Sequence, residues 1–184
     1  AYGILGATQN NAIDLLYLLG VDEFNVGASI GKDTFVIYQG HHGDQGAARA
    51  DVILPGVAYT EKDGLYVNTE GRVQLAKKAV SPLGQAREDW KILRALSDKI
   101  SKPLPYNTLA QLRARLVAEF AQFGKIGQVV AAPWAAFGRA GDIRVHPFHS
   151  PIDNFYMTNS ISRSSKTMAA CTEAFVYPTK TAEA

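Results

Sequence analysis

The chain has 184 residues, of which 47% are hydrophobic and 20% charged, and its formal net charge is +2. This is the composition of an ordinary globular protein that can bury a core of its own. The near-neutral balance, without long runs of one sign, predicts neither a nucleic acid nor an anionic membrane as a partner. The longest apolar runs, residues 15–19 and 129–137, are far shorter than the about 20 residues that cross a bilayer.

Short apolar runs bounded by turn residues predict three buried strands, at residues 12–21, 35–39 and 51–55. Nearly continuous apolar runs are typical of strands that are covered on both faces of a parallel sheet, so the predicted fold class is α/β. Residues 22–33 contain two glycines and little helical periodicity, which argues against a full crossover helix between the first two strands. Residues 65–75 alternate as a hairpin does, with Asn68-Thr69-Glu70-Gly71 as its turn.

A glycine-rich loop, residues 40–50, follows the second predicted strand. Its glycines stand at positions 40, 43 and 46, which matches neither the dinucleotide fingerprint nor the P-loop, and no helix of useful length follows. A phosphate cradle is therefore the weaker interpretation. A tight connection between strands, with glycines at positive φ, is the stronger one.

The histidines offer a possible metal site. His41 and His42 precede Asp44, and His146 and His149 have an H-x-x-H spacing. Pro147 argues against a regular element that would aim both of the later rings at one point, and adjacent histidines on an extended segment point to opposite sides. The sequence therefore predicts loop histidines and no metal ligands.

Two further kinds of residue could carry chemistry, and neither predicts a site. The single cysteine, Cys171, excludes an intrachain disulfide and cannot alone hold an iron–sulphur cluster or a structural zinc. Glu61 and Glu70 lack an identifiable nucleophile, so ion pairs with Lys62 or Arg72 are the favoured interpretation. No catalytic, cofactor-binding or metal residue is predicted.

Beyond Pro82 the apolar period becomes helical. The first predicted helix covers residues 86–100, with Glu88 and Asp89 in its first turn. The second starts at Asn107 as its N-cap and is closed by Gly124. Their apolar stripes, predicted to be core faces, consist of Ile92, Leu93, Leu96 and Ile100 in the first helix and Leu109, Leu112, Leu116, Phe120 and Phe123 in the second.

Residues 125–151 are rich in glycine, alanine and proline and predict an extended segment anchored by Trp134 and Phe137. A last short helix is predicted at residues 164–175, with Met168, Cys171 and Phe175 on one side. Arg163 and Lys166 near its start are unfavourable for the helix dipole, so acidic partner groups are expected there. The tail from Asn154 onward is expected to dock as an arm, away from the two earlier helices.

Several segments of the sequence resemble one family. They are FVIYQGHHGDQGAARADVILPGVAYTEKDGLYVNTEGRVQ, SPLGQAREDWKILRALSD, LPYNTLAQLRARL and the tail FYMTNSISRSSKTMAAC. Together they resemble the C-terminal part of the large iron–sulphur subunit of respiratory complex I, which is the 75 kDa subunit in mitochondria and the G subunit in bacteria. ADVILP, EKDG and NTEGR are shared across the molybdopterin oxidoreductases, whereas YQGHHGD and the tail are typical of complex I.

The resemblance implies a scaffold. In that subunit the 2Fe-2S and 4Fe-4S clusters are held by cysteines and a histidine in an N-terminal region that does not correspond to this chain, and the molybdopterin-like domain generally holds no molybdenum. The expected role is a non-catalytic part of NADH:ubiquinone oxidoreductase in the respiratory chain. The alternative is a fragment of a molybdopterin enzyme such as formate dehydrogenase, whose pterin would touch the loop 40–50 and the hairpin.

The same resemblance predicts the organisation, the partners and the location. Residues 1–124 are expected to be the C-terminal part of a longer molybdopterin oxidoreductase-like domain, residues 125–151 an extended segment, and residues 152–184 an arm with a short helix. The expected partners are the rest of the same subunit and other peripheral-arm subunits. The expected location is the matrix side of the mitochondrial inner membrane, or the cytoplasmic side of a bacterial one.

Overall fold

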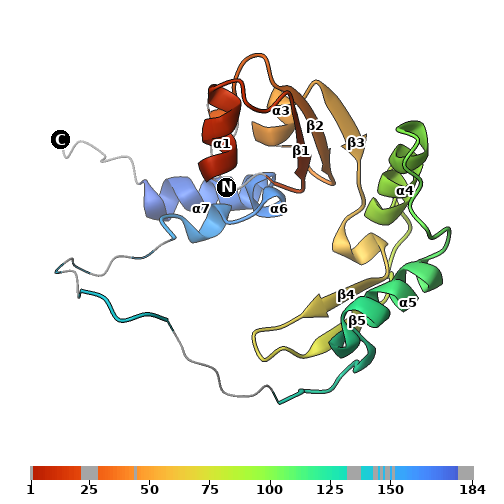
Figure 1. Cartoon of the computed structure of the whole chain (residues 1–184). Coiled ribbons are helices and arrows are strands. Elements are labelled where there is room, and N and C mark those ends of the chain that lie inside the picture. Colours follow the sequence, from red (N-terminus) through yellow and green to blue (C-terminus); the bar gives the residue numbers. More distant parts are fainter. Residues whose placement is uncertain are drawn as a thin grey trace, which may run out of the picture. The chain divides into compact units, whose positions relative to one another are not determined.

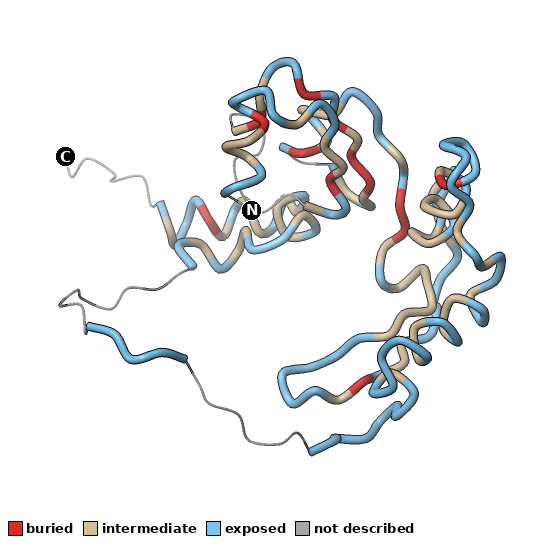
Figure 2. The backbone as a smooth tube through the Cα atoms, viewed as in Figure 1, coloured by how far each residue is buried: buried red, intermediate tan, exposed pale blue. Residues whose placement is uncertain are grey.

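The computed structural model describes residues 2–21, 29–43, 45–131, 138–142, 145, 147, 150 and 152–177 (Figure 1). The chain divides into two compact units. The first consists of Ala1–Leu54 and His146–Ala184, and the second consists of Pro55–Val145. Figure 2 shows buried residues of the first unit both in its strands and in the helices and connections around them.

The first unit contains a three-stranded sheet in the order β1, β2, β3. The strands are β1 Leu15–Leu19, β2 Phe35–Gly40 and β3 Val52–Pro55. β1 and β2 are parallel, with Leu15 opposite Phe35 and Leu19 opposite Gln39. The three predicted strands and the α/β class are confirmed.

The core of this unit lies on one face of the sheet. Leu18, Val36 and Tyr38 are buried there, and Leu5 and Ala47 pack against them. Leu5 comes from helix α1 and Ala47 from helix α3; the two helices cover Tyr2–Gln9 and Gln45–Arg49. The sequence did not predict α1, and the loop 40–50 holds a short helix where none of useful length was expected.

The opposite face of the sheet differs from the prediction. Side chains alternate across a strand, so Leu15, Leu19 and Phe35 point away from the core face. All three are exposed. Among the described elements, α1 and α3 pack on one face of the sheet, which leaves these three side chains of the other face exposed.

The predicted reason for the loop glycines is also wrong. Positive φ occurs at other glycines, among them Gly20 and Gly71, whereas none is found at Gly40. Gly40 is instead suited to a close approach, because a Cβ there would lie 2.4 Å from Oη of Tyr38. That hydroxyl donates to the carbonyl of His42 at 2.7 Å, which fixes the ring beside the glycine.

A second close approach leads to a prediction. A Cβ at Gly31 would lie 2.1 Å from the backbone oxygen of Thr8. Gly31→Ala is therefore expected to lower the free energy of unfolding by about 1–3 kcal/mol, because backbone must move to admit the methyl group. Gly6→Ala is the matched control: nothing lies within 4 Å of that Cβ, so the change should stabilise α1 by about 0.5–1 kcal/mol. Amide hydrogen exchange in α1 and β2 measures both, and equal protection of the two variants would contradict the packing argument.

The second unit contains a hairpin. Its strands are β4 Gly64–Val67 and β5 Val73–Ala76, which are antiparallel. Asn68 Oδ1 accepts the backbone N–H groups of Glu70 and Arg72 in the turn. A single parallel bridge joins Gly56 to Arg87, and the N–H of Arg87 donates to the carbonyl of Pro55 at 3.0 Å. The predicted hairpin and its turn are confirmed.

Helix α4, Asp89–Lys99, confirms the first predicted helix. Ile92, Leu93 and Leu96 are half-buried, but Ile100 is exposed. The buried side chain is that of Ser97, whose hydroxyl donates to the Arg94 carbonyl and accepts the N–H of Leu104. The predicted stripe is therefore a half-buried face that does not extend to Ile100.

Helix α5 covers Leu109–Glu119, and its cap differs by one residue from the prediction. The N-cap is Thr108, which forms a capping box with Gln111. Asn107 lies outside the helix. Leu109, Leu112, Leu116 and Phe123 of the stripe are half-buried and Phe120 is exposed. Two 3-10 helices complete the unit, η1 Tyr59–Glu61 and η2 Ala121–Gly124.

One of the two expected glutamate pairs is present. Arg72 and Glu70 form an ion pair at 3.2 Å, which confirms that interpretation. The predicted ion pair of Glu61 with Lys62 is wrong. Glu61 accepts the N–H of Ala58 in a capping box, while Lys62 pairs with an aspartate.

The tail contains two short helices where one was predicted. The elements are η3 Phe155–Met157, α6 Ser160–Arg163, α7 Lys166–Cys171 and the π-helical turn η4 Thr172–Val176. Asn159 caps α6 and Ser165 caps α7. Since Arg163 lies in the last turn of α6, its charge is favourable there, and the predicted conflict was wrong for that residue.

The segment of the second unit that follows η2 has little regular structure where it is described. Residues 125–131 and 138–142 contain neither helix nor strand. Gly127 contacts the hairpin, since its N–H donates to Val73 and its carbonyl accepts from Arg72. The predicted anchors Trp134 and Phe137 lie outside the described residues.

Candidate functional site

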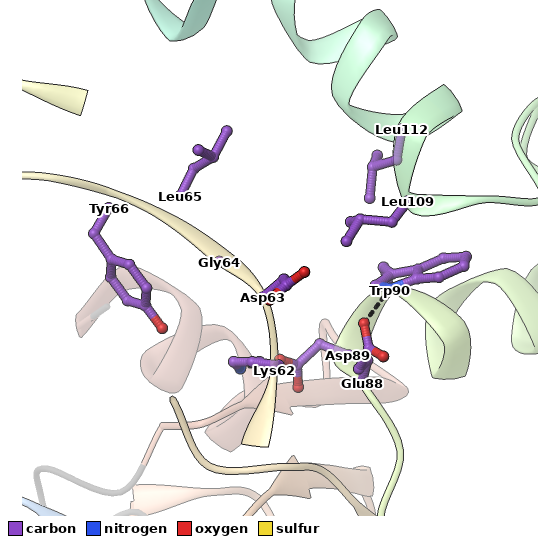
Figure 3. A pocket seen from close by; sticks show the side chains of 10 residues that line it. All are labelled: Lys62, Asp63, Gly64, Leu65, Tyr66, Glu88, Asp89, Trp90, Leu109 and Leu112. Atoms are coloured by element: carbon purple, nitrogen blue, oxygen red, sulfur yellow. Dashed lines mark hydrogen bonds and ion pairs between the residues drawn. The ribbon is translucent and has the colours of Figure 1, made fainter. Parts of the chain in front are cut away.

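A pocket of about 310 Å³ opens in the second unit, between the start of β4 and the first turns of α4 and α5 (Figure 3). Leu65 and Tyr66 come from the hairpin, Trp90 from α4, and Leu109 and Leu112 from α5. The polar members are Lys62, Asp63, Glu88 and Asp89. The walls are thus mainly apolar, with four charged groups around them.

Two hydrogen bonds hold the Glu88 carboxylate. Trp90 Nε1 donates to one oxygen at 2.8 Å, and Lys91 Nζ donates to the other at 2.8 Å. Burial raises the pKa of Glu88, but the hydrogen bonds from Lys91 and Trp90 outweigh it and hold the pKa below 4.5. Glu88 is therefore ionised at neutral pH and orients the indole ring that forms one wall.

The other charged groups of the pocket are also engaged. Asp63 accepts the backbone N–H of Lys78 at 2.8 Å, and that bond lowers the pKa of its carboxyl below 3.8. Lys62 and Asp89 form an ion pair. A general acid at neutral pH needs a raised pKa, and neither Glu88 nor Asp63 has one. The walls are mainly apolar, and neither of these two carboxyl groups is suited to act as a general acid.

The interactions of Glu88 give a pH prediction. Glu88→Gln is expected to lower the stability of the first turn of α4 by about 0.5–1.5 kcal/mol at pH 7, because two charge-assisted bonds are lost. Since the pKa is lowered, this contribution is complete above pH 4.5 and is lost as the pH falls through the folded pKa. Exchange protection of the α4 amides in the two proteins should therefore differ by a constant amount from pH 8 to pH 5. If the difference in protection shrinks between pH 8 and pH 5, the lowered pKa of Glu88 is contradicted. Glu119→Gln is the control, because Glu119 forms an exposed ion pair with Arg115.

The histidines lie differently from the prediction. Nδ1 of His41 and Nδ1 of His42 are 2.7 Å apart, with the rings edge to face, so the two side chains do not point to opposite sides. A bend of the chain at these residues replaces the expected extended backbone. His146, His149 and Asp44 lie outside the described residues. Within the described ranges, no group of three metal-ligating side chains occurs.

The loop 40–50 does not fit a phosphate or pyrophosphate group. Its cation, Arg49, donates through Nη2 to the carbonyls of Gly31 and Thr34, each at 3.0 Å. Nη1 of Arg49 lies 3.6 Å from the carboxylate of Asp51. This guanidinium links the segment before β2 to the start of β3, a role that was not predicted from the sequence. Only the spacing of Arg49 before Asp51 could have indicated it.

Two family models match different parts of the chain. A family model described as molybdopterin oxidoreductase matches residues 2–99, more than half of the chain. The chain belongs to the molybdopterin oxidoreductase family. A second model, which describes the C-terminal region of the G subunit of NADH-ubiquinone oxidoreductase, matches residues 118–171.

Curated relatives of this family member are similar over most of its length. The mitochondrial NADH-ubiquinone oxidoreductase 78 kDa subunit of Candida albicans is 50% identical over 87% of the chain. The subunit of the same name from Neurospora crassa is 47% identical over 86% of it. The G subunit of the NADH-quinone oxidoreductase of Rickettsia bellii is 44% identical over 88%. The chain spans 24%, 22% and 24% of these relatives, about a quarter of their length.

These relatives confirm the resemblance to the large complex I subunit, and they do not favour the formate dehydrogenase alternative. A molybdopterin group is implied by the family name alone. The described residues do not fit it, because the loop arginine is bound to backbone carbonyls and the pocket carboxylates are already paired. None of the described helices is long and apolar enough to cross a membrane.

Proposed function

We propose that this chain is a structural, non-catalytic part of the peripheral-arm iron–sulphur subunit of NADH:ubiquinone oxidoreductase. It supports electron transfer from NADH to quinone, which is carried by 2Fe-2S and 4Fe-4S clusters outside the chain. The observation that carries the proposal is the identity of 44–50% to subunits of that enzyme over nearly nine-tenths of the chain. The match of residues 118–171 to the second family model, which is specific to the complex I subunit, supports it independently of the broader family.

The side chains support a scaffold role. The carboxylates of the pocket are bonded to neighbours, and Arg49 is bonded to the backbone. The partners are then the rest of the same subunit and the neighbouring arm subunits. The location is the matrix side of the mitochondrial inner membrane, or the cytoplasmic side of a bacterial membrane.

Affinity purification tests the proposal. A tag on this chain in its native host should recover peripheral-arm subunits together with NADH oxidation activity and iron, without stoichiometric molybdenum. A molybdenum-containing complex with formate oxidation would favour the alternative. Recovery of the chain without other subunits would overturn the proposed function.

The tail provides a prediction within this proposal. A hydrogen bond joins the two ends of the tail, since Asn154 Nδ2 donates to Thr172 Oγ1 at 3.1 Å. The side chains of Phe155 and Phe175 are exposed. Deletion from Asn154 onward is expected to lower the yield of assembled peripheral arm several-fold, because exposed aromatic residues commonly anchor interfaces. The cluster signals per assembled complex should not change, since no ligand is removed.

Electron paramagnetic resonance of the purified arm measures the clusters, and subunit staining measures the yield. A control deletion of residues 178–184 should leave both unchanged. Normal assembly without the tail would contradict its docking role, whereas altered cluster spectra would contradict a purely structural role.

A further inference from the structure

The pocket of the second unit has apolar walls from three elements. Leu65 comes from β4, Trp90 from α4 and Leu112 from α5 (Figure 3). The indole ring is held in place, because its Nε1 donates to the Glu88 carboxylate at 2.8 Å and Nζ of Lys91 lies 5.5 Å from the ring centroid. A wall that is already fixed loses little conformational freedom when a partner contacts it. The pocket is therefore a preformed apolar recess.

The size of the recess indicates the kind of group that it can receive. Its volume of about 310 Å³ is at the small end of the range of about 300–1,000 Å³ that is typical of ligand sites. One large aromatic or aliphatic side chain suits it better than a cofactor. Such side chains, buried in recesses of a partner, supply much of the binding energy of protein interfaces. Tyr66 on the wall is 42% exposed, so the recess is open at the surface.

The rim of the recess carries more positive than negative charge. Two ion pairs there are Lys62–Asp89 and Glu88–Lys91. The remaining carboxylate, Asp63, lies near three cations. The backbone N–H of Lys78 makes the largest contribution to the lowered pKa of Asp63, and the positive charges of Lys77, Arg113 and Lys78 lower that pKa further. Within the described part of the chain, these three cationic side chains form no hydrogen bond or ion pair, so two positive charges remain in excess.

The helix that completes the recess lies outside the match to the broader family. The molybdopterin oxidoreductase match ends at residue 99, α5 begins at Leu109, and the complex I match begins at residue 118. Both Leu109 and Leu112 of α5 line the recess. The cofactor of the broader family therefore does not explain a recess that needs this wall. A protein segment with an apolar side chain and a negative charge is the occupant that fits the walls and the rim.

We propose that the recess receives one large apolar side chain from a segment of a neighbouring subunit, and that a carboxylate beside it on that segment pairs with the cations Lys77, Lys78 and Arg113. The inference rests on the proposed function, because the neighbouring subunits are those of the complex. It adds to that function a defined contact site and the chemistry of the partner segment.

Photo-cross-linking in the complex that the tagged chain recovers tests the occupant. Tyr66 is replaced by p-benzoylphenylalanine, and Val67 carries the same probe as the matched control, because adjacent residues of a strand point to opposite faces. The expected product joins position 66 to another subunit, at an apolar residue close to an aspartate or glutamate. A cross-link from position 66 to this chain or to the rest of its own subunit, no cross-link there, or the same product from position 67 would each overturn the inference.

Charge reversal at the rim provides the second measurement. The double variant Lys77→Glu, Arg113→Glu is expected to lower the amount of chain retained in the complex about tenfold, because like charges then face each other across the contact. The control double variant Lys102→Glu, Lys125→Glu makes the same change of net charge at exposed lysines that do not line the recess and should be retained normally. Exchange of the two rim cations, Lys77→Arg with Arg113→Lys, keeps both charges and should also be retained normally.

Equal retention of the two charge-reversed double variants would overturn the inference, and so would equal losses from the rim reversal and from the exchange of the rim cations. The proposed function is tested separately by co-purification of the unaltered chain, and it would stand after either result.

Discussion

Purified on its own, this chain is expected to associate with itself rather than remain a monomer. β1 and β3 are the outer strands of the three-stranded sheet, and Leu15, Leu19 and Phe35 are exposed on one of its faces. Unpaired strand edges and exposed apolar faces drive association at concentrations of about 1 μM and above. Most of the protein should therefore sediment as dimers or larger species at about 10 μM.

Sedimentation velocity over a concentration series measures this result. The triple variant Leu15→Lys, Leu19→Lys, Phe35→Lys is the matched test, since it adds charge to the exposed face and leaves the core face unchanged. The monomer fraction should rise several-fold in that variant. A monomeric profile for the unaltered chain, combined with a single cooperative thermal transition, would refute the expectation.

Arg49→Met is expected to cost about 2–4 kcal/mol of local stability in the strand connection, because three backbone carbonyls and the carboxylate of Asp51 lose their cation together. The side chain of Arg49 is only 20% exposed, so water replaces the lost donors poorly. Gly31 and Thr34, the acceptors at 3.0 Å, belong to the segment that leads into β2. The substitution should therefore destabilise both the segment before β2 and the start of β3.

Hydrogen exchange of the β2 amides measures the effect of Arg49→Met as a loss of protection of about 30-fold or more, which is the equivalent of 2 kcal/mol. Arg115→Met is the control. Arg115 pairs with Glu119 on an exposed helix face, where such pairs contribute less than about 0.5 kcal/mol. Similar losses of protection in both variants would contradict the expected contribution of the Arg49 hydrogen bonds and ion pair to stability.

The strands and the hairpin could be predicted because their signals are local. Phe35 to Gln39 is a continuous apolar run, and Asn68 to Gly71 has the residues of a tight turn. Helix α1 could not be predicted in this way. It contains Gly3 and Gly6, which disfavour a helix, and it forms where Leu5 packs against the buried strands. Tertiary contact overrides local propensity there.

The errors at helix ends have a common cause. Asn107 and Thr108 are both good N-caps, and only the reach of Gln111 back to the backbone decides in favour of Thr108. In the tail, Ser165 caps a new helix and so separates Arg163 from Lys166. The pocket was not predicted because its walls come from three elements whose packing the sequence does not encode locally.

The bridge between Gly56 and Arg87 has a consequence for how this chain can vary. The chain leaves β3, forms the hairpin and returns to the same point before α4 begins. A closed excursion of this kind can change in length at little cost, because doubling a flexible loop costs only about 0.6 kcal/mol. Homologous chains can therefore differ in length at the Asn68–Gly71 turn while Gly56 and Arg87 stay paired, and a peptide tag inserted there should leave both strands of the hairpin intact.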